Sequence, residues 1–237
     1  MPRRAVLLGG VAVLVAGFSL LGTWQVQRLA WKRDLIARVG ARVHAAPVPA
    51  PGPAEWPGIG RARHEYLRVR ADGRYLHGRE ALVQASTELG SGYWVLTPLQ
   101  TRDGTLVWIN RGFVPPEARD PARRGRPAPE GDVQVEGLLR ISEPGGGFLR
   151  DNDPAADRWF SRDVAALSSA RGLPAKRTAP YFIDAQALAG TPAGTWPAAG
   201  LTVVRFPNSH LAYAITWYGM ALLLLGATVH LLRTGKM

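Results

Sequence analysis

Two long apolar runs without a charged residue, one near each end, limit what this chain can fold into. The first extends from Ala5 to Thr23 and the second from Leu211 to Leu232, and neither contains Asp, Glu, Lys or Arg. A bilayer core takes about 20 helical residues, so each run is long enough to span it. The first run is longer than a signal-peptide core, and no small-residue cleavage site precedes Trp24, which favours an uncleaved anchor. The sequence therefore predicts a membrane protein with two transmembrane helices.

Basic residues flank the outer ends of both apolar runs. Arg3 and Arg4 precede the first run, and Arg233 and Lys236 follow the second. The positive-inside rule therefore predicts that both termini are cytoplasmic, and that the region between the runs lies in the periplasm of a cell with an inner membrane. The predicted order is a transmembrane helix over 1–23, a soluble periplasmic domain over 24–208, a second transmembrane helix over 209–232 and a cytoplasmic tail over 233–237.

Cysteine content and charge argue against two classes of function. The chain has no cysteine, which excludes disulfides, thiolate-bound zinc or iron–sulfur centres and thiol-based redox chemistry. Its formal net charge of +11 suits a nucleic-acid partner at first sight, but the 29 basic residues are scattered and nearly all are arginine. No stretch interleaves them with stacking aromatic residues in a known motif, so we expect no nucleic-acid binding.

Helical spacing of apolar residues continues beyond the first span. Leu29, Ile36, Val39 and Val43 recur at about helical intervals, which predicts a helix over 24–43. The next stretch, AAPVPAPGPAEWPGIG, is rich in Pro, Gly and Ala. Such a composition predicts a linker without regular structure, which we place at 44–64.

The remainder of the periplasmic region, 65–208, alternates short strand-like runs with turn signals. Asp72-Gly73 is interpreted as a turn between the first two runs, and Asp103-Gly104 is a strong hairpin signal. Asp163 is placed to cap a helix that ends near Gly172. We expect a mainly antiparallel small barrel or sandwich, of α+β type, with one or two helices. The predicted strands are YLRVR (66–70), RYL (74–76), ALVQAS (81–86), YWVLTPL (93–99), TLVWIN (105–110), VQVEGLLR (133–140), YFID (181–184) and LTVVR (201–205).

Motifs of catalytic chemistry are missing from this sequence. It contains no nucleophile elbow, phosphate-binding loop, zincin helix or dinucleotide fingerprint. The acidic stretch DNDPAADRWFSRD has Ala156 and Arg162 where an EF-hand calcium loop needs Gly and Glu. Arg111, in the segment NRG, has either a structural or a binding role, and we favour a buried structural ion pair. These features predict a protein that is not an enzyme.

Six segments, in order along nearly the whole chain, resemble the surfeit locus protein 1 family. The last of them, at the start of the second apolar run, is the most specific. Phe113 stands where the family usually has Trp. The segments are LGTWQVQRLAWKRDLI (21–36), GYWVLTPL (92–99), VWINRGFVP (107–115), VEGLLR (135–140), WFSRD (159–163) and PNSHLAYAITWYGMA (207–221).

The resemblance implies a factor that assists the assembly of haem–copper cytochrome oxidases. Such proteins act while haem a is inserted into the catalytic subunit I, so haem a, subunit I and haem a synthase are the implied cofactor and partners, beside the lipid bilayer. The family's axial ligand to the haem iron corresponds to His210 and its haem-associated Trp to Trp217. The alternative is a membrane scaffold that stabilises an oxidase assembly intermediate and binds no haem.

Helical geometry is compatible with a shared site for these residues. His210 and Trp217 differ by about 20° in direction and lie roughly 10 Å apart along an α-helix, and Tyr213 flanks the same face. An imidazole nitrogen can ligate haem iron. The aromatic residues can equally form a belt at the membrane interface. Arg28, outside the first span, is expected to contact lipid phosphate rather than a haem propionate.

Small residues on the opposite face of the second span suggest how the two spans pack. Ala212, Gly219 and Gly226 lie about 160–200° from His210. Small residues let membrane helices approach closely, and Gly10 and Gly17 in the first span have the same spacing. Two interpretations are open: the spans pack through these faces, which would leave the face carrying His210 free for a cofactor or partner, or glycine is present only because it is common in membrane helices.

Overall fold

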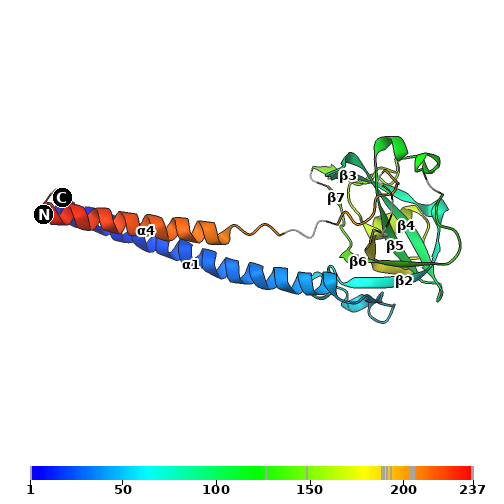
Figure 1. The fold of residues 1–237 in the computed structure, drawn as a ribbon, viewed down its shortest axis with the longest axis horizontal. Helices are drawn as coiled ribbons and strands as arrows, with labels where there is room; N and C mark the ends of the chain where they lie inside the picture. Colours follow the sequence, from blue (N-terminus) through cyan, green and yellow to red (C-terminus); the bar gives the residue numbers. More distant parts are fainter. Residues whose placement is uncertain are drawn as a thin grey trace. The chain divides into compact units, whose positions relative to one another are not determined.

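The computed structural model describes residues 2–125, 127–147, 149–187, 190, 192, 194–202 and 206–235. The chain forms two compact units, Met1–Arg38 with Val204–Met237, and Val39–Val203. The first is a pair of long helices and the second is built around a β-sheet (Figure 1). Each unit is described separately below.

The helical unit contains most of α1 and all of α4. The helix α1 spans Pro2–His44, of which the part up to Arg38 belongs to this unit, and α4 spans His210–Arg233. The two helices run antiparallel, so that both termini lie at the same end of this unit (Figure 1). Both are long and apolar enough to cross a membrane. Within the apolar runs 5–23 and 211–232 the outward side chains are mostly apolar, and Val6, Leu20 and Leu223 are 76%, 71% and 75% exposed. Such a surface suits lipid.

A seam of buried and half-buried residues joins the two helices. Along each helix these residues alternate three and four positions apart, the spacing by which antiparallel helices keep one face together. In α4 the seam includes Ala214, Ala221 and Thr228, which are 2%, 6% and 7% exposed. The helix seam consists of Val11, Val15, Phe18, Gly22, Gln25 and Leu29 in α1, and of His210, Ala214, Trp217, Ala221, Leu224 and Thr228 in α4.

The predicted contact through small residues is therefore wrong. A side chain added at Gly10, Gly17, Gly219 or Gly226 would meet no atom within 4 Å. The face that carries His210 meets α1 instead, because it offers aromatic stacking and a partner for the polar Gln25. Leaving the buried Gln25 amide without a hydrogen bond would cost about 1–3 kcal/mol, so this face is favoured over a face of small residues alone.

The second unit contains a seven-stranded sheet in the order β1-β2-β6-β9-β5-β4-β3. An additional pairing of β2 with β4 closes the five central strands into a barrel. All pairings are antiparallel except β1 with β2 and β5 with β9. The prediction of a mainly antiparallel barrel or sandwich is thus confirmed, and the structure has the barrel. The strands are β1 (Val48–Pro49), β2 (Arg68–Tyr75), β3 (Ala81–Thr87), β4 (Gly90–Thr101), β5 (Leu106–Val114), β6 (Val133–Ile141) and β9 (Thr178–Ala185), and β7 (Gly146–Gly147) pairs with β8 (Arg150–Asp151) in a separate small sheet.

Apolar residues fill the barrel and also cover part of its outside. The interior cluster comes from alternate residues of the five central strands, as expected where one face of each strand points inward. A second cluster lies under α3 (Val164–Ala170), where the Trp108 indole nitrogen donates to Ser168 Oγ at 2.9 Å. Asp163 caps α3 by accepting from Ala166 N, and Gly172 follows with a φ of 63°. The predicted helix is confirmed.

Gly73 shows why one predicted turn is wrong. The strand β2 continues through Asp72-Gly73, and Gly73 pairs with both Val133 of β6 and Thr101 of β4. A Cβ at this position would collide with the carbonyl oxygen of Gln100. Glycine therefore serves here to let two strands approach at a barrel corner, rather than to reverse the chain.

The segment 44–64 is more ordered than a linker. Its Val48–Pro49 pairs with β2, a 3-10 turn covers Trp56–Gly58, and α2 covers Arg61–His64. The Trp56 indole and the Tyr181 hydroxyl both donate to the carbonyl oxygen of Pro51, at 2.9 and 2.7 Å. Proline prevents a long regular element, but side chains fix the path of the chain against the barrel.

Two other sheet predictions have different outcomes. The hairpin at Asp103-Gly104 is confirmed, since β4 and β5 pair on either side of it. The strand expected over 201–205 falls largely on 203–205, which lie outside the described residues. Leu201 and Thr202 belong to no strand.

Candidate functional site

His210 is the first residue of α4 and lies in the helix seam. Its Nδ1 is 2.7 Å from Oε1 of Gln25, which comes from α1. The Gln25 residue is only 9% exposed. Two polar side chains thus meet at one end of an otherwise apolar contact between the helices.

This hydrogen bond determines which imidazole nitrogen is free. An amide oxygen can only accept, so Nδ1 of His210 carries the proton and donates a hydrogen bond to Gln25. In the neutral ring, Nε2 then keeps its lone pair. No hydrogen bond to Nε2 occurs among the residues that the structure describes. A neutral imidazole in this tautomer can bind a metal ion through Nε2.

Trp217 lies two turns further along the same seam. Its ring stacks on Phe18 of α1, with the centroids 5.8 Å apart and the planes 26° from parallel. Next to it, the Tyr218 hydroxyl is 3.0 Å from Thr23 Oγ1, whose own hydroxyl donates to the carbonyl oxygen of Ser19. The aromatic contacts therefore fix α4 against α1 just below His210.

The structure brings His210 and Trp217 onto one seam, but it does not place Tyr213 there. Tyr213 is 56% exposed, and Ala214 takes the seam position beside it. His230 lies 20 residues beyond His210, about 30 Å along a helix, so it cannot share a site with it. Arg28 has its guanidinium over the ring of Trp31, at 4.8 Å from the centroid.

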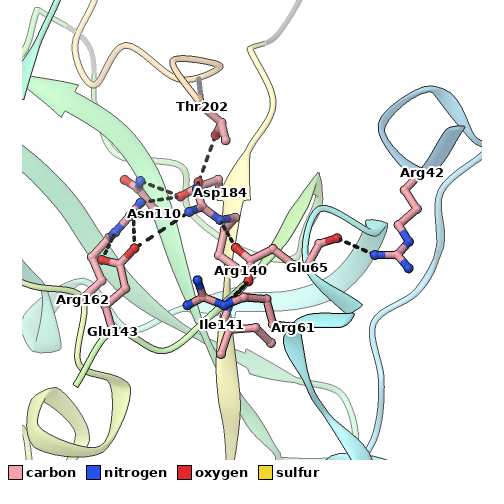
Figure 2. Close-up of polar contacts among 10 residues, drawn as sticks. All are labelled: Arg42, Arg61, Glu65, Asn110, Arg140, Ile141, Glu143, Arg162, Asp184 and Thr202. Atoms are coloured by element: carbon pink, nitrogen blue, oxygen red, sulfur yellow. Dashed lines mark hydrogen bonds and ion pairs between the residues drawn. The ribbon is translucent and has the colours of Figure 1, made fainter. Parts of the chain in front are cut away.

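The barrel unit contains a buried charge network centred on Asp184 of β9 (Figure 2). The side chain of Asp184 is 4% exposed. Arg140 Nη1 donates to its Oδ2 at 2.9 Å, and Asn110 Nδ2 donates to its Oδ1 at 2.8 Å. Arg162 Nη1 and Thr202 Oγ1 supply further donors, at 3.3 and 2.9 Å. The carboxylate is thus fully satisfied.

Arg140 and Arg162 each join Asp184 to a second carboxylate (Figure 2). Arg140 Nε donates to Glu65 Oε1 at 2.8 Å, and Arg162 donates to both oxygens of Glu143, at 3.0 and 2.6 Å. Two arginines and three carboxylates in alternation stabilise one another, because each buried charge has a partner of opposite sign.

The network also reaches the end of α1. Arg42 donates to the carbonyl oxygens of Glu65 and Ala62, at 3.2 and 2.6 Å. These two contacts tie the last turn of α1 to the segment that the sequence had suggested was a linker. The role of this part of the network is structural.

The expected structural ion pair of Arg111 is present. Its Nη1 lies 3.6 Å from Glu80 Oε2, and its side chain is 9% exposed. Arg124 binds the same carboxylate with two hydrogen bonds, at 2.9 and 2.7 Å. Arg111 also lies over the ring of Tyr75, and burial raises the pKa of the Tyr75 hydroxyl to about 12.

Comparison with known proteins identifies the family. The sequence model of the SURF1 family matches residues 12–222. The chain belongs to the SURF1 family. The surfeit locus protein 1 of Homo sapiens is 36% identical over 221 residues, which are 85% of this chain and 69% of the human protein. That of Rattus norvegicus is 36% identical over 217 residues, covering 84% and 67% of the two chains.

A SURF1-like protein from Monosiga brevicollis shows a longer match, 36% identical over 238 residues, covering 95% of this chain and 87% of that protein. The SURF1 family match includes Phe18, Gln25, His210 and Trp217, since all lie within residues 12–222. The matched region therefore covers the barrel, most of α1 and the first part of α4.

Sequence reasoning missed the partners that α1 supplies to this site. Gln25 and Phe18 were not recognised because the periodicity of the first span was interpreted from its glycines. The alternation of Val11, Val15, Phe18 and Leu29 was the available signal, since it places Gln25 in the same stripe.

Proposed function

We propose that this SURF1 family member assists the assembly of a haem–copper cytochrome oxidase. In this proposal it binds haem a and holds it for insertion into subunit I, with haem a synthase as the source of the haem. It acts as a chaperone for a cofactor and does not catalyse a reaction. Haem is therefore its cargo.

The observation that carries the proposal is the orientation of His210. Histidines that ligate haem iron do so through one ring nitrogen, and metal-ligating histidines generally donate the other N–H to a polar group. His210 has this arrangement, since Nδ1 donates to Gln25 and Nε2 of the neutral ring retains its lone pair. The His210 side chain is therefore suited to act as a ligand of haem iron.

Aromatic residues near His210 suit the body of a porphyrin. Trp217 and the exposed Tyr213 lie within two turns of it along α4. A large apolar ring gains free energy when it leaves water, and aromatic contacts add roughly 1 kcal/mol to that burial. Trp217 already stacks on Phe18, so we assign it a smaller share of haem binding than His210.

The proposed location follows from the charges at the chain ends. With both termini in the cytoplasm, His210 lies at the periplasmic end of the second span and the barrel unit lies in the periplasm. The protein would then be a multi-pass protein of the inner membrane. The antiparallel course of α1 and α4 supports placing both termini on one side (Figure 1).

A scaffold that binds no haem is the second candidate function. It is favoured by the contact of the His210 face with α1, because that contact already uses Gln25 and one face of Trp217. On this alternative, His210 holds the two helices together, and the barrel unit contacts the oxidase subunits.

A deletion strain with complementation separates the two functions. Without the gene, we expect normal amounts of the oxidase polypeptides but lowered haem a content and lowered oxidase activity. Wild-type protein should restore both, and His210→Ala should not. Full restoration by a stably inserted His210→Ala protein would favour the scaffold, and normal activity in the deletion strain would contradict both functions.

A further inference from the structure

We propose that Gln25 is a positioning residue for the haem ligand: it fixes the His210 ring in the tautomer whose Nε2 is free to bind iron. This inference rests on the proposed function and adds a residue from the first span to the site. The site would then require both helices, although the iron ligand comes from α4 alone.

The place of Gln25 in the helix seam is the first argument. Every other seam position of α1 is apolar or glycine, namely Val11, Val15, Phe18, Gly22 and Leu29. Burial of a glutamine at one such position is costly unless its amide is hydrogen-bonded. The 2.7 Å contact with His210 Nδ1 satisfies the amide oxygen, and the residue is 9% exposed. A polar residue in this seam is therefore explained by its histidine partner.

The chemistry of the amide is the second argument. A glutamine oxygen accepts a hydrogen bond from Nδ1 without carrying a charge, and in the neutral ring the lone pair is then on Nε2. A carboxylate in the same place would draw that proton more strongly and make the ligand more basic. A neutral acceptor gives a ligand of intermediate strength, which suits a protein that must release its haem again.

Neighbouring groups do not replace Gln25 in this role. Thr23 Oγ1 is engaged with Tyr218 and with the carbonyl oxygen of Ser19. Arg28 lies over Trp31 and can only donate hydrogen bonds. In the described part of the chain, Gln25 is the side chain bound to His210 Nδ1.

The tautomer can be measured without haem, and this tests Gln25 alone. Four full-length proteins, the wild type, Gln25→Leu, Gln25→Glu and Gln27→Leu, would be labelled with 15N-histidine and placed in lipid nanodiscs. The 15N NMR spectrum of His210 then reports which ring nitrogen carries the proton. Gln27 is the matched control, because it is the same residue type in the same helix and is exposed. We expect protonated Nδ1 at His210 in wild type, Gln25→Glu and Gln27→Leu, and a mixture of tautomers in Gln25→Leu. An unchanged spectrum in Gln25→Leu would overturn the inference.

Haem binding by the same proteins tests the consequence. Removal of such an outer partner typically lowers metal affinity about 10- to 100-fold, which we expect for Gln25→Leu and not for Gln27→Leu. The midpoint potential of bound haem should rise in Gln25→Leu and fall in Gln25→Glu, because the ligand becomes a weaker or a stronger electron donor. Gln25→Glu retains an acceptor, so it remains informative if Gln25→Leu inserts poorly.

Failure of the role of Gln25 and failure of the proposed haem-binding function give different results. Wild-type haem affinity and potential in both Gln25 variants, with haem lost in His210→Ala, would contradict the role of Gln25 and leave the proposed function standing. Haem retained in His210→Ala would contradict the proposed function, whatever the tautomer. A tautomer change together with the expected affinity and potential shifts would support both.

Discussion

Asp184 and Arg140 form a buried ion pair between the neighbouring strands β9 and β6. Arg140 Nη1 lies 2.9 Å from Asp184 Oδ2, and their side chains are 14% and 4% exposed. The same carboxylate accepts hydrogen bonds from Asn110, Arg162 and Thr202. A single side chain thus joins three strands (β5, β6 and β9), the segment before α3 and a later loop, which makes it a sensitive test of how the barrel is stabilised.

We expect Asp184→Ala to lower the free energy of unfolding by about 3–5 kcal/mol. It removes one of the two carboxylates that each buried arginine contacts, and it leaves the buried donors of Asn110 and Thr202 without their acceptor. Asp132→Ala is the control, since Asp132 pairs with Arg74 at 2.6 Å but their side chains are 55% and 70% exposed. An exposed pair contributes at most about 1 kcal/mol. Denaturation of the full-length protein, followed by near-UV circular dichroism, gives both values. Equal losses in the two variants would show that the network does not hold the barrel.

Gly73 tests how the barrel closes. Alanine at this position would push against the carbonyl oxygen of Gln100, where β2 meets β4. We expect Gly73→Ala to destabilise the protein by about 1–3 kcal/mol, the usual cost of overpacking. Gly78→Ala should change stability by less than about 0.5 kcal/mol, because no atom lies within 4 Å of the added group. A similar small effect at Gly73 would contradict the close strand approach.

The strands of the barrel could be predicted from the sequence, but the way distant strands pair could not. Alternation predicted the strands of β3 to β6, and the Asp103-Gly104 signal predicted their hairpin, because both depend on neighbouring residues. The parallel pairing of β5 with β9, which joins Asn110 to Asp184, depends on segments far apart in the chain. Local pattern contains no information on such a pairing, so the buried charge network was not predicted.

The residues that α4 contributes to the candidate site were predicted from the sequence, and those that α1 contributes were missed. His210 and Trp217 were recognised from the resemblance and from helical spacing, and they do share one face. The choice of the opposite face for helix contact was wrong, because glycine spacing was weighed without the polar requirement of Gln25. For the contact between the two helices, the hydrogen bond of one buried amide outweighs the close approach that several small residues allow.

Cross-linking distinguishes the two faces directly. The chain has no cysteine, so paired cysteines can be introduced without background. We expect Phe18→Cys with Trp217→Cys to cross-link readily in membranes, because the two rings stack at 5.8 Å. The control pair, Gly17→Cys with Gly219→Cys, should cross-link poorly, since no atom lies within 4 Å of either added group. A shift in gel mobility measures both, and the reverse order would contradict the helix seam.

The haem-to-protein ratio of His210→Ala tests the central claim most directly. Wild type, His210→Ala, Trp217→Ala and His230→Ala would be purified side by side from cells that make haem a, and their Soret absorption compared. Loss of most haem is expected in His210→Ala, a smaller loss in Trp217→Ala, and none in His230→Ala, which is about 30 Å away along the helix. Membrane insertion should be normal in all four, since His210 lies at the end of α4. Full haem retention in His210→Ala would contradict the account.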